Sequence, residues 1–428
     1  MSVKLSRQDN EFLDGRRGKA GRMAMRIVVR MAEVADAPEL MDISQAHIDG
    51  CGLLSDAGLE FAETLAAGGG RVSVPTTLNM GPLDLQNWEH FGVNKEFAAK
   101  AVRQGKAYTD MGCIPTWSCA PYQGYLTPRF GQQIAWGESN AICYANSVLG
   151  ARTNRYGDFM DICAAITGRA PKCGLHLKEN RRGQILLRLA DLEPAPTQST
   201  AFYAALGHYL GSAAEDKIPV IEGLDAAVSS DQLKALCAAA ASAGAVAMFH
   251  AVGVTPEANS LEEAFGGNEP ERIIDVSLSD LQKAWDDLST AKEKDKLDLV
   301  VLGCPHFSFD EFRDLAGLIR QKTEQGQRLA PEVKFVIISC QSSYALAERS
   351  EYLDVARGFG AEITLDTCVF HTPMVGGDTK VIMTNSGKCA YYAPGELGVN
   401  VAFGTMADCV ESAVAGCVRR KEVLWKGS

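Results

Sequence analysis

The stretch LDLVVLGCPH, residues 297–306, decides the fold class of this chain. A short apolar run rich in β-branched residues is followed by a glycine and a cysteine. This pattern is typical of a buried strand whose carboxyl end lies at a ligand-binding site. Two later stretches have the same design, VKFVIISCQ (333–341) and AEITLDTCVF (361–370). Helical patterns at 308–321 and 344–358 separate them. Strands that alternate with helices in this way predict a parallel sheet with right-handed crossovers.

The same alternation extends outward from this stretch. Further strands are expected at PVIEGL (219–224), AVAMFHAVG (245–253) and KVIMTNS (380–386). Towards the N-terminus, a helical pattern over 10–35 precedes the strand-like run PELMDISQAHIDGCG (38–52), and a helix is expected over 59–67. A second strand is expected to end near Pro75, in GGGRVSVPTTLN (68–79). The chain is therefore predicted to be an α/β protein.

Composition sets limits on the organisation and on the partners. With 428 residues, 46% hydrophobic and 22% charged, we expect two or three packed lobes, with a boundary that separates residues 1–195 from 196–428. The formal net charge of −11 argues against nucleic acid and anionic membranes as partners. The sequence has no apolar run of about 18 residues and no secretory signal at its N-terminus. Thirteen cysteines, an odd number, suit a reducing compartment, so a cytoplasmic location is expected.

Three cysteines stand where parallel strands are expected to end, namely Cys304, Cys340 and Cys368. Such strand ends lie side by side in one sheet, so their thiols can converge on iron or zinc. The spacing does not match a zinc finger, and the alternative is three buried thiols. Cys113 and Cys119 lie in a loop before a helix, where a thiolate is favoured. Five others lie in alanine-rich helical patterns and are expected to be structural: Cys143, Cys163, Cys237, Cys409 and Cys417.

Polar residues gather in three further segments. His47 and Asp49 alternate at strand spacing, so both can face one cleft. The run GESNAICYANSVLGARTNR (137–155) is predicted to be a helix with Arg152 and Arg155 on one face, suited to a carboxylate; the alternative is a salt-bridged surface. MTNSGKCAYYAPG (383–395) places polar groups and a glycine after a strand, where backbone N–H groups can face an anion.

Taken together, these segments resemble the large subunit of the aconitase X family. The resemblance rests on LDGRRGKAGRMAM (13–25), ISQAHIDG (43–50), VPTTLN (74–79), SCAPY (118–122), AWGESNAICYANSVLGARTNR (135–155), GCPHFS (303–308), DTC (366–368) and MTNSGKCAYYAPG. It implies an aconitase-like, multi-lobed, three-layer α/β/α fold with mainly parallel sheets. It also implies a hydro-lyase that dehydrates a small hydroxy acid with an iron–sulfur cluster, either 4Fe-4S or 2Fe-2S. The family acts on cis-3-hydroxy-L-proline in bacteria and on mevalonate 5-phosphate in archaea.

By motif, the resemblance assigns Cys119, Cys304 and Cys368 as cluster ligands. Cys113 is the alternative to Cys119, and Cys119 replaces Cys340, which strand position alone had suggested. Ala120 and Asn140 depart from the family pattern, where Thr and Ser are usual. The remaining expected site residues are catalytic or bind the substrate. The catalytic group is His47, Asp49, Ser386 and Lys388, and the substrate-binding group is Thr76, Asn79, Ser139, Asn154 and Arg155.

The resemblance further implies a small swivelling domain that supplies a serine base. This sequence does not contain one, so the expected partner is a separate small subunit, and the chain alone is expected to be inactive. We favour cis-3-hydroxy-L-proline as the substrate, to be converted to Δ1-pyrroline-2-carboxylate, because no dense Arg/Lys cluster is present for a phosphate. The alternatives are a mevalonate 5-phosphate dehydratase large subunit and a non-catalytic cluster- or zinc-binding protein, which would need four protein ligands.

Overall fold

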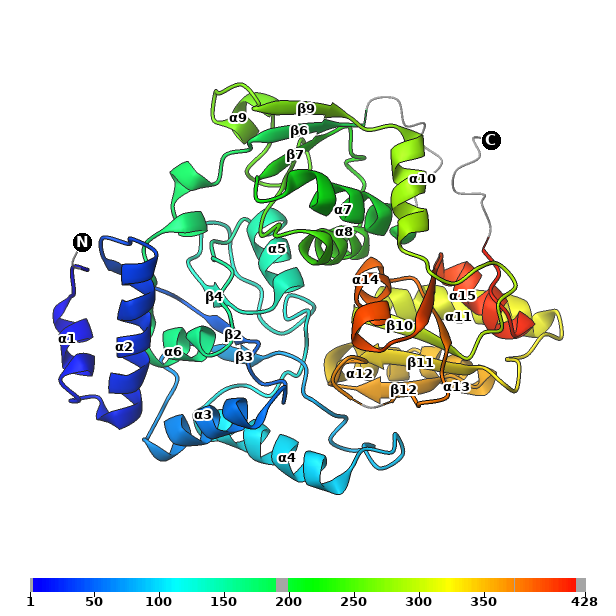
Figure 1. Ribbon diagram of the computed structural model, residues 1–428, viewed down its shortest axis with the longest axis horizontal. Coiled ribbons are helices and arrows are strands. Elements are labelled where there is room, and N and C mark those ends of the chain that lie inside the picture. Colours follow the sequence, from blue (N-terminus) through cyan, green and yellow to red (C-terminus); the bar gives the residue numbers. More distant parts are fainter. Residues whose placement is uncertain (1–2, 190–198, 373, 421–428) are drawn as a thin grey trace. The chain divides into compact units, whose positions relative to one another are not determined.

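The computed structural model describes residues 3–189, 199–372 and 374–420 (Figure 1). The chain forms two compact units, one from Met1–Arg182 with Asp366–Thr372 and one from Gly183–Leu365 with Pro373–Ser428. The boundary predicted at residue 195 lies outside the described residues. The prediction also placed Cys368 in the C-terminal lobe, whereas its segment folds with the first unit. Among the described residues, no helix is long and apolar enough to cross a membrane.

The first unit is built on a small parallel sheet in the order β3-β2-β4, beside an antiparallel pair of β1 and β5. Its strands are β1 (Leu40–Asp42), β2 (Ala46–Ile48), β3 (Thr76–Leu78), β4 (Ala135–Trp136) and β5 (Arg169–Pro171). Its helices are α1 (Arg7–Leu13), α2 (Gly18–Val34), α3 (Asp56–Ala67), α4 (Lys95–Asp110), α5 (Ser139–Ser147) and α6 (Met160–Thr167), followed by the short 3-10 turns η1 (Gly174–His176) and η2 (Lys178–Asn180).

The core of this unit is formed by apolar residues of α2 and α6 that pack on β2. Met25 and Val28 of α2, Ile162 and Ile166 of α6, and Ile48 of β2 belong to one buried cluster. Because all three residues of β2 are buried, the strand is covered on both faces. The packing fixes β2 at the centre of the unit, directly before the residues of the candidate site.

The second unit contains two parallel sheets. The five-stranded sheet has the order β12-β11-β10-β13-β14, with β10 (Leu299–Phe307), β11 (Lys334–Ser339), β12 (Glu362–Leu365), β13 (Val381–Thr384) and β14 (Asn400–Phe403). The four-stranded sheet has the order β8-β7-β6-β9, with β6 (Ile185–Arg188), β7 (Pro219–Glu222), β8 (His250–Ala251) and β9 (Arg272–Asp275). These sheets confirm the α/β prediction.

Three helices cover one face of the five-stranded sheet: α11 (Phe309–Glu324), α13 (Tyr352–Phe359) and α15 (Met406–Ala415). Their apolar residues form one core with the strands. A separate helix, α14 (Gly387–Glu396), contacts β10, β13 and β14. The other helices of the unit are α7 (Thr200–Ala214), α8 (Ser230–Ala243), α9 (Leu261–Phe265), α10 (Leu278–Asp287) and α12 (Gln341–Arg349).

Small residues bring α7, α8 and α14 unusually close together. A Cβ added at Gly207 of α7 would lie 2.4 Å from the carbonyl oxygen of Leu236 in α8. A Cβ added at Gly387, the first residue of α14, would lie 3.0 Å from the Cβ of Ala239. The three helices therefore pack against one another, and residues at the starts of α7 and α14 and in α8 line part of the candidate site.

Several predicted elements need correction. β3 begins after Pro75 instead of ending there, so Thr76 lies inside a strand. The predicted helix over 344–358 is two helices, α12 and α13, because Glu351 adopts a left-handed backbone conformation with φ of 62° between them. The N-terminal helical pattern is likewise divided into α1 and α2. These errors move boundaries and leave the order of elements unchanged.

Candidate active site

In the first unit, polar side chains gather where β2 and β3 end. Parallel pairing places His47 opposite Thr77, and His47 Nδ1 lies 2.8 Å from Thr77 Oγ1. Just beyond the strands, the Asn79 side chain donates a hydrogen bond to the Asp49 carboxylate. Two buried atoms, His47 Nε2 and Asn79 Oδ1, have no hydrogen-bond partner among the described residues. Because buried polar atoms normally have partners, these two mark a place where a ligand or water can bind.

The imidazole of His47 is neutral at physiological pH. Its ring is fully buried, with its centroid 5.7 Å from that of Trp136. Burial lowers the pKa of His47 to about 4, against the opposing effect of the Glu138 charge. Thr77 Oγ1 also lies 3.5 Å from the Ala46 carbonyl oxygen. If Thr77 donates to that carbonyl, it accepts from His47 Nδ1–H, and Nε2 is then an acceptor for a ligand.

A buried carboxyl group, Asp161 of α6, holds the turn that follows β2. Its Oδ2 accepts hydrogen bonds from the backbone N–H groups of Asp49 at 2.6 Å and Gly50 at 3.4 Å, and its Oδ1 accepts from that of Ile162 at 2.6 Å. Burial raises the pKa of Asp161 to about 8, although the backbone hydrogen bonds oppose this. Gly137 must lack a side chain here, since a Cβ would lie 2.8 Å from Asp161 Oδ2. In the sequence, the only signal that could have identified Asp161 is its position as a single acidic residue in an otherwise apolar helical stretch.

Two of the expected substrate-binding side chains already have local partners. Thr76 is buried in β3 and donates a hydrogen bond to the Val74 carbonyl at 2.8 Å. Ser139 is half-buried at the start of α5 and lies 3.3 Å from the Glu138 carboxylate. That carboxylate also caps α5 by accepting from the N–H of Ala141 at 2.6 Å. Both residues lie near the polar cluster in sequence, but their hydroxyls stabilise local structure.

The prediction of one helix from Gly137 to Arg155 is wrong. α5 ends at Ser147, and Gly150 follows in a left-handed conformation with φ of 64°. After it, the Asn154 side chain donates to the Cys173 carbonyl at 3.1 Å and accepts from the Leu175 N–H at 2.8 Å. Arg155 is exposed. The polar side chain of Asn154 therefore stabilises the irregular segment after α5. Arg152 and Arg155 do not share a helix face.

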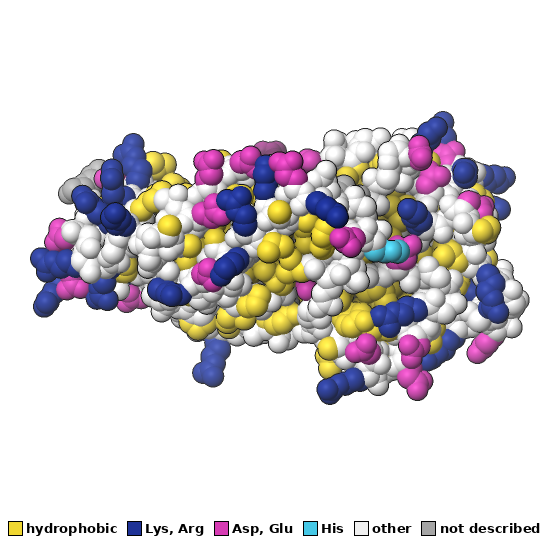
Figure 2. All heavy atoms as spheres, turned by 90° about the horizontal axis from the view of Figure 1, so that it is seen from below, with side chains coloured by type: hydrophobic (Ala, Val, Ile, Leu, Met, Phe, Trp, Pro, Cys, Tyr) yellow, Lys and Arg dark blue, Asp and Glu magenta, His cyan; other side chains and the backbone are white. Residues whose placement is uncertain are grey.

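Cys119 follows a tightly packed tryptophan in the first unit. Trp117 is 8% exposed, and a Cβ at Gly105 of α4 would lie 3.0 Å from its ring. The same ring lines an apolar pocket with Leu85 and Val102, which are exposed by 45% and 49%. Figure 2 shows one face of the molecule, where hydrophobic side chains gather among charged ones. The packing anchors the start of the loop, and the Cys119 carbonyl accepts from the Asn140 side chain at 3.0 Å.

The segment that carries Cys368 packs against the same loops. The N–H of Gly81 donates to the Asp366 carbonyl at 2.6 Å, and the Thr372 hydroxyl donates to the Pro82 carbonyl at 2.9 Å. A Cβ at Gly81 would lie 3.3 Å from the Asp366 carbonyl oxygen and 3.5 Å from the Trp117 ring. Cys119 and Cys368 therefore belong to neighbouring loops of one unit. Their side chains are both half-buried.

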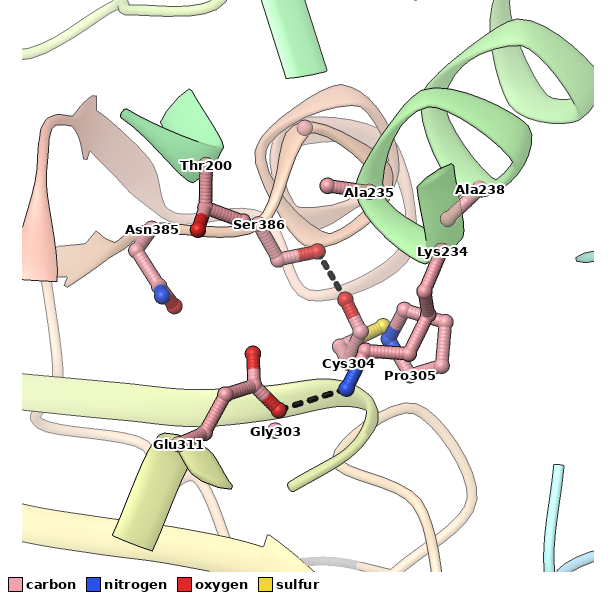
Figure 3. A pocket seen from close by; sticks show the side chains of 11 residues that line it. Thr200, Lys234, Ala235, Ala238, Gly303, Cys304, Pro305, Glu311, Asn385 and Ser386 are labelled. Atoms are coloured by element: carbon pink, nitrogen blue, oxygen red, sulfur yellow. Dashed lines mark hydrogen bonds and ion pairs between the residues drawn. The ribbon is translucent and has the colours of Figure 1, made fainter. Parts of the chain in front are cut away.

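Cys304 belongs to the second unit and lies inside β10, not beyond its end as expected. The register between β10 and β11 is irregular between Leu302 and Phe307. Gly303 allows this, because a Cβ there would lie 2.0 Å from the Ile338 carbonyl oxygen. The Ser386 hydroxyl donates a hydrogen bond to the Cys304 carbonyl and accepts from the N–H of Cys389 at 3.0 Å, capping α14 (Figure 3). Ser386 thus holds Cys304 in place.

Around Cys304 lies a small pocket that the sequence pattern does not reveal. Its polar lining comprises Thr200, Lys234, Glu311, Asn385 and Ser386 (Figure 3). Lys388 of the expected catalytic group is half-buried in the first turn of α14, directly after the pocket residue Gly387. The pocket has a volume of about 20 Å³. This volume holds about one water molecule.

A buried ion-pair network supports this pocket. Lys234 of α8 is 2% exposed, and its Nζ lies 2.5 Å from Glu311 and 3.0 Å from Asp231. Nζ also donates to the His306 carbonyl at 3.2 Å. Burial raises the pKa of Glu311 to about 7, while Lys234 opposes that shift. From the sequence, a lysine in an alanine-rich helix is expected at the surface. The ion pairs of Lys234 are therefore not predicted.

The cysteines differ in exposure, and the difference separates the predicted ligands from most other thiols. Among the thirteen, five are half-buried: Cys119, Cys173, Cys304, Cys368 and Cys417. The two alternative ligands are buried. Burial raises the pKa of Cys113 far above its usual range. Burial also opposes ionisation of Cys340, yet hydrogen bonds from His306 and Ser342 and the His306 charge lower its pKa to about 5.

The donor chemistry of the three predicted ligands fits an iron–sulfur cluster, since such clusters take cysteine thiolates. Cys119, Cys304 and Cys368 are half-buried and form no disulfide. Within the described ranges, no three His, Cys, Asp or Glu side chains come together closely enough to hold a metal ion. Two of the three predicted ligands come from the first unit and one from the second.

Comparison with protein families gives three matches that follow one another along the chain. Residues 2–179 match the model of the aconitase X first domain, residues 183–286 the second domain and residues 297–415 the third domain. A crystal structure of aconitase X from Thermococcus kodakaraensis in its holo-form is similar at a TM-score of 0.86 and 31% identity, covering 96% of this chain and 100% of that one.

Curated relatives fall into two groups. A cis-3-hydroxy-L-proline dehydratase from Pseudomonas aeruginosa is 46% identical, covering 95% of this chain and 69% of the relative. One from Hypocrea jecorina is 43% identical, covering 97% and 69%. A phosphomevalonate dehydratase large subunit from Methanothermobacter thermautotrophicus is 37% identical, covering 94% and 96%.

Proposed function

This chain belongs to the aconitase X family, and from that premise we propose that it is the large subunit of a dehydratase that removes water from cis-3-hydroxy-L-proline. The observation that carries this proposal is the order of identities. They are 46% and 43% with two cis-3-hydroxy-L-proline dehydratases, and 37% with a phosphomevalonate dehydratase large subunit. The reaction breaks the C2–H and C3–O bonds of the ring, releases water and gives an enamine that tautomerises to Δ1-pyrroline-2-carboxylate.

We further propose that Cys119, Cys304 and Cys368 hold an iron–sulfur cluster. Their half-buried thiols support this assignment. When bound through three cysteines, such a cluster supplies a Lewis acid with an open position for the substrate hydroxyl. The Ser386 hydroxyl fixes the carbonyl of Cys304, and Asn140 fixes that of Cys119 at 3.0 Å. Both side chains therefore orient the backbone of a proposed ligand.

The polar cluster at β2 and β3 supplies groups that can bind the leaving hydroxyl. His47 Nε2 and Asn79 Oδ1 are buried acceptors without partners in the described chain. A hydroxyl or released water donates hydrogen bonds, so it complements both atoms. Asp49 is held by Asn79 and by Asp161, which fixes where its carboxylate points. Arg155 is exposed and Lys388 half-buried, and they remain the proposed cations for the substrate carboxylate.

The proposed partner is a small subunit. The names of relatives support this partner, because this chain covers 96% of a relative from Methanothermobacter that is named a large subunit. It covers 69% of each of the two cis-3-hydroxy-L-proline dehydratases. The serine base of the reaction is expected from that partner. The cytoplasmic location stays a prediction from the cysteine content.

The test is turnover by the reconstituted complex. The chain is loaded anaerobically with iron and sulfide, mixed with the small subunit, and given either cis-3-hydroxy-L-proline or mevalonate 5-phosphate. We expect water loss from the first substrate, little from the second, and none without the small subunit. Preference for mevalonate 5-phosphate would replace the substrate assignment, and a complex that carries a cluster but dehydrates neither compound would refute the function.

A further inference from the structure

The indole N–H of Trp136 is a buried donor that the site described above does not use. Trp136 is the last residue of β4 and is 0% exposed. Its Nε1 has no hydrogen-bond partner among the described residues, whereas its backbone N–H donates to the Thr153 hydroxyl at 3.2 Å. A buried tryptophan normally finds an acceptor for its N–H, so this atom indicates a bound molecule that carries one.

The register of the sheet places Trp136 next to His47. β4 pairs in parallel with β2 so that Trp136 lies opposite His47, and β3 pairs on the other side of β2 with Thr77 opposite His47. Side chains in register on neighbouring strands lie on the same face of a sheet. His47 Nδ1 is 2.8 Å from Thr77 Oγ1, so Nε2, at the other side of the ring, is directed away from Thr77. The His47 and Trp136 ring centroids are 5.7 Å apart, which brings the unpartnered nitrogen of each ring into one buried region.

Among the described residues, this face of the sheet carries one unpartnered donor and three unpartnered acceptors. Side chains alternate along a strand, so Gln45 lies on the face of His47. Asn79 likewise lies on the face of Thr77, and both Gln45 Oε1 and Asn79 Oδ1 are buried. The third acceptor is His47 Nε2, in the tautomer that donates from Nδ1 to Thr77. Ionised carboxylate oxygens carry no hydrogen for these acceptors, whereas a hydroxyl group or a water molecule both donates and accepts.

We propose that Trp136 binds the reacting hydroxyl group of the substrate, with its indole N–H donating to the C3 oxygen while His47 Nε2 accepts the hydrogen of that hydroxyl. This inference rests on the proposed function and adds a binding residue to its site. As the C3–O bond breaks, its electron pair moves onto this oxygen, so a donor placed there binds the transition state more tightly than the substrate. The contribution of Trp136 should therefore depend on the C3 hydroxyl and be absent for a ligand that lacks it.

The first test is kinetic and uses the cluster-loaded complex with its small subunit. Trp136→Phe keeps an aromatic ring beside His47 but carries no N–H. The matched control, Trp88→Phe, makes the same change at a half-buried tryptophan of the same unit that packs on a separate apolar cluster, and it should match the wild type. We expect Trp136→Phe to lower kcat/KM for cis-3-hydroxy-L-proline about tenfold, as for a lost hydrogen bond to a developing charge. Inhibition by L-proline, which lacks the hydroxyl, should stay unchanged. A wild-type kcat/KM in Trp136→Phe, or an equal loss for both ligands, would overturn the inference.

The second test observes the indole N–H directly and needs no turnover. In the cluster-free complex, with this chain isotope-labelled at nitrogen, the five tryptophans contribute one indole N–H signal each to the NMR spectrum. The signal missing from Trp136→Phe belongs to Trp136. We expect cis-3-hydroxy-L-proline to shift this signal and L-proline to leave it in place, and the same response to both ligands would contradict a hydroxyl site. A hydroxyl-dependent shift in a complex that dehydrates nothing once loaded with its cluster would refute the proposed function alone, so the two failures are distinguished.

Discussion

Asp161 shows how one buried side chain can organise a site without touching a ligand. Its carboxyl group accepts hydrogen bonds from three backbone N–H groups, two of which belong to the turn that carries Asp49. Asp161 is fully buried, and two of the three donors belong to the buried residues Gly50 and Ile162. The position of the Asp49 carboxylate therefore depends on Asp161.

Replacing Asp161 by Ala should destabilise the protein by about 2–4 kcal/mol, because buried N–H groups lose their acceptor. Asp161→Asn keeps an acceptor oxygen and should cost less than half as much. Urea denaturation of both variants measures the difference. Equal stability of Asp161→Ala and the wild type would show that the turn does not need this carboxyl group.

His47 should make the folded protein sensitive to acid. Its pKa is lowered from 6.5 to about 4 by burial, so the folded state resists protonation and the unfolded state does not. The contribution of His47 to stability is complete above pH 6.5 and is lost as the pH falls from 6.5 towards 4. Over that range, the wild type should lose about 3 kcal/mol more than His47→Gln.

The measurement is the free energy of unfolding between pH 4 and pH 8. His90→Gln removes an exposed histidine and is the control, expected to leave the pH dependence as in the wild type. Another buried histidine, His176, also has a pKa lowered to about 4, so some acid sensitivity should remain in His47→Gln. Parallel curves for His47→Gln and the wild type would contradict the buried neutral imidazole.

At the scale of elements, the start of α14 links helix stability to the position of Cys304. Ser386 caps the helix through the N–H of Cys389 and donates to the Cys304 carbonyl. Ser386→Ala should cost about 1 kcal/mol through the lost cap. It should also loosen the backbone at Cys304, so that this thiol is alkylated faster in the cluster-free chain.

The matched control for that prediction is Ser277→Ala, which removes the cap of α10 in the same unit. It should cost a similar amount and leave Cys304 alkylation unchanged. Residue-resolved mass spectrometry reports the rates for all five half-buried cysteines. The same Cys304 rate in both variants would mean that Ser386 is only a helix cap.

The elements are largely predictable because their signals are local. Apolar β-branched runs before Cys304, Cys340 and Cys368 predict three neighbouring strands, and β10, β11 and β12 do pair in parallel. Single residues with unusual backbone conformations escape this reading. In the polar segment 137–155, which looks helical, α5 ends at Ser147 and Gly150 follows in a left-handed conformation. Glu351 divides another predicted helix in two.

At the scale of the molecule, the sequence reveals the family through its motifs but conceals how the segments divide between the units. Cys368 comes three residues after β12 of the second unit, yet hydrogen bonds at Gly81 and Pro82 hold its segment in the first. The buried ion pair of Lys234 and Glu311 joins residues 77 positions apart, and no local sequence pattern predicts it. Contacts of this range depend on the tertiary fold, which local patterns do not encode.

The central proposal is that Cys119, Cys304 and Cys368 hold one iron–sulfur cluster on which dehydration depends. The most direct test is to change each to Ala, reconstitute the complex anaerobically, and measure bound iron and sulfide together with turnover of cis-3-hydroxy-L-proline. Cys173→Ala and Cys417→Ala, which remove the other half-buried thiols, are the controls. We predict loss of cluster and turnover in each of the three variants and neither loss in the controls. A variant of Cys119, Cys304 or Cys368 that keeps both its cluster and its turnover would contradict the account.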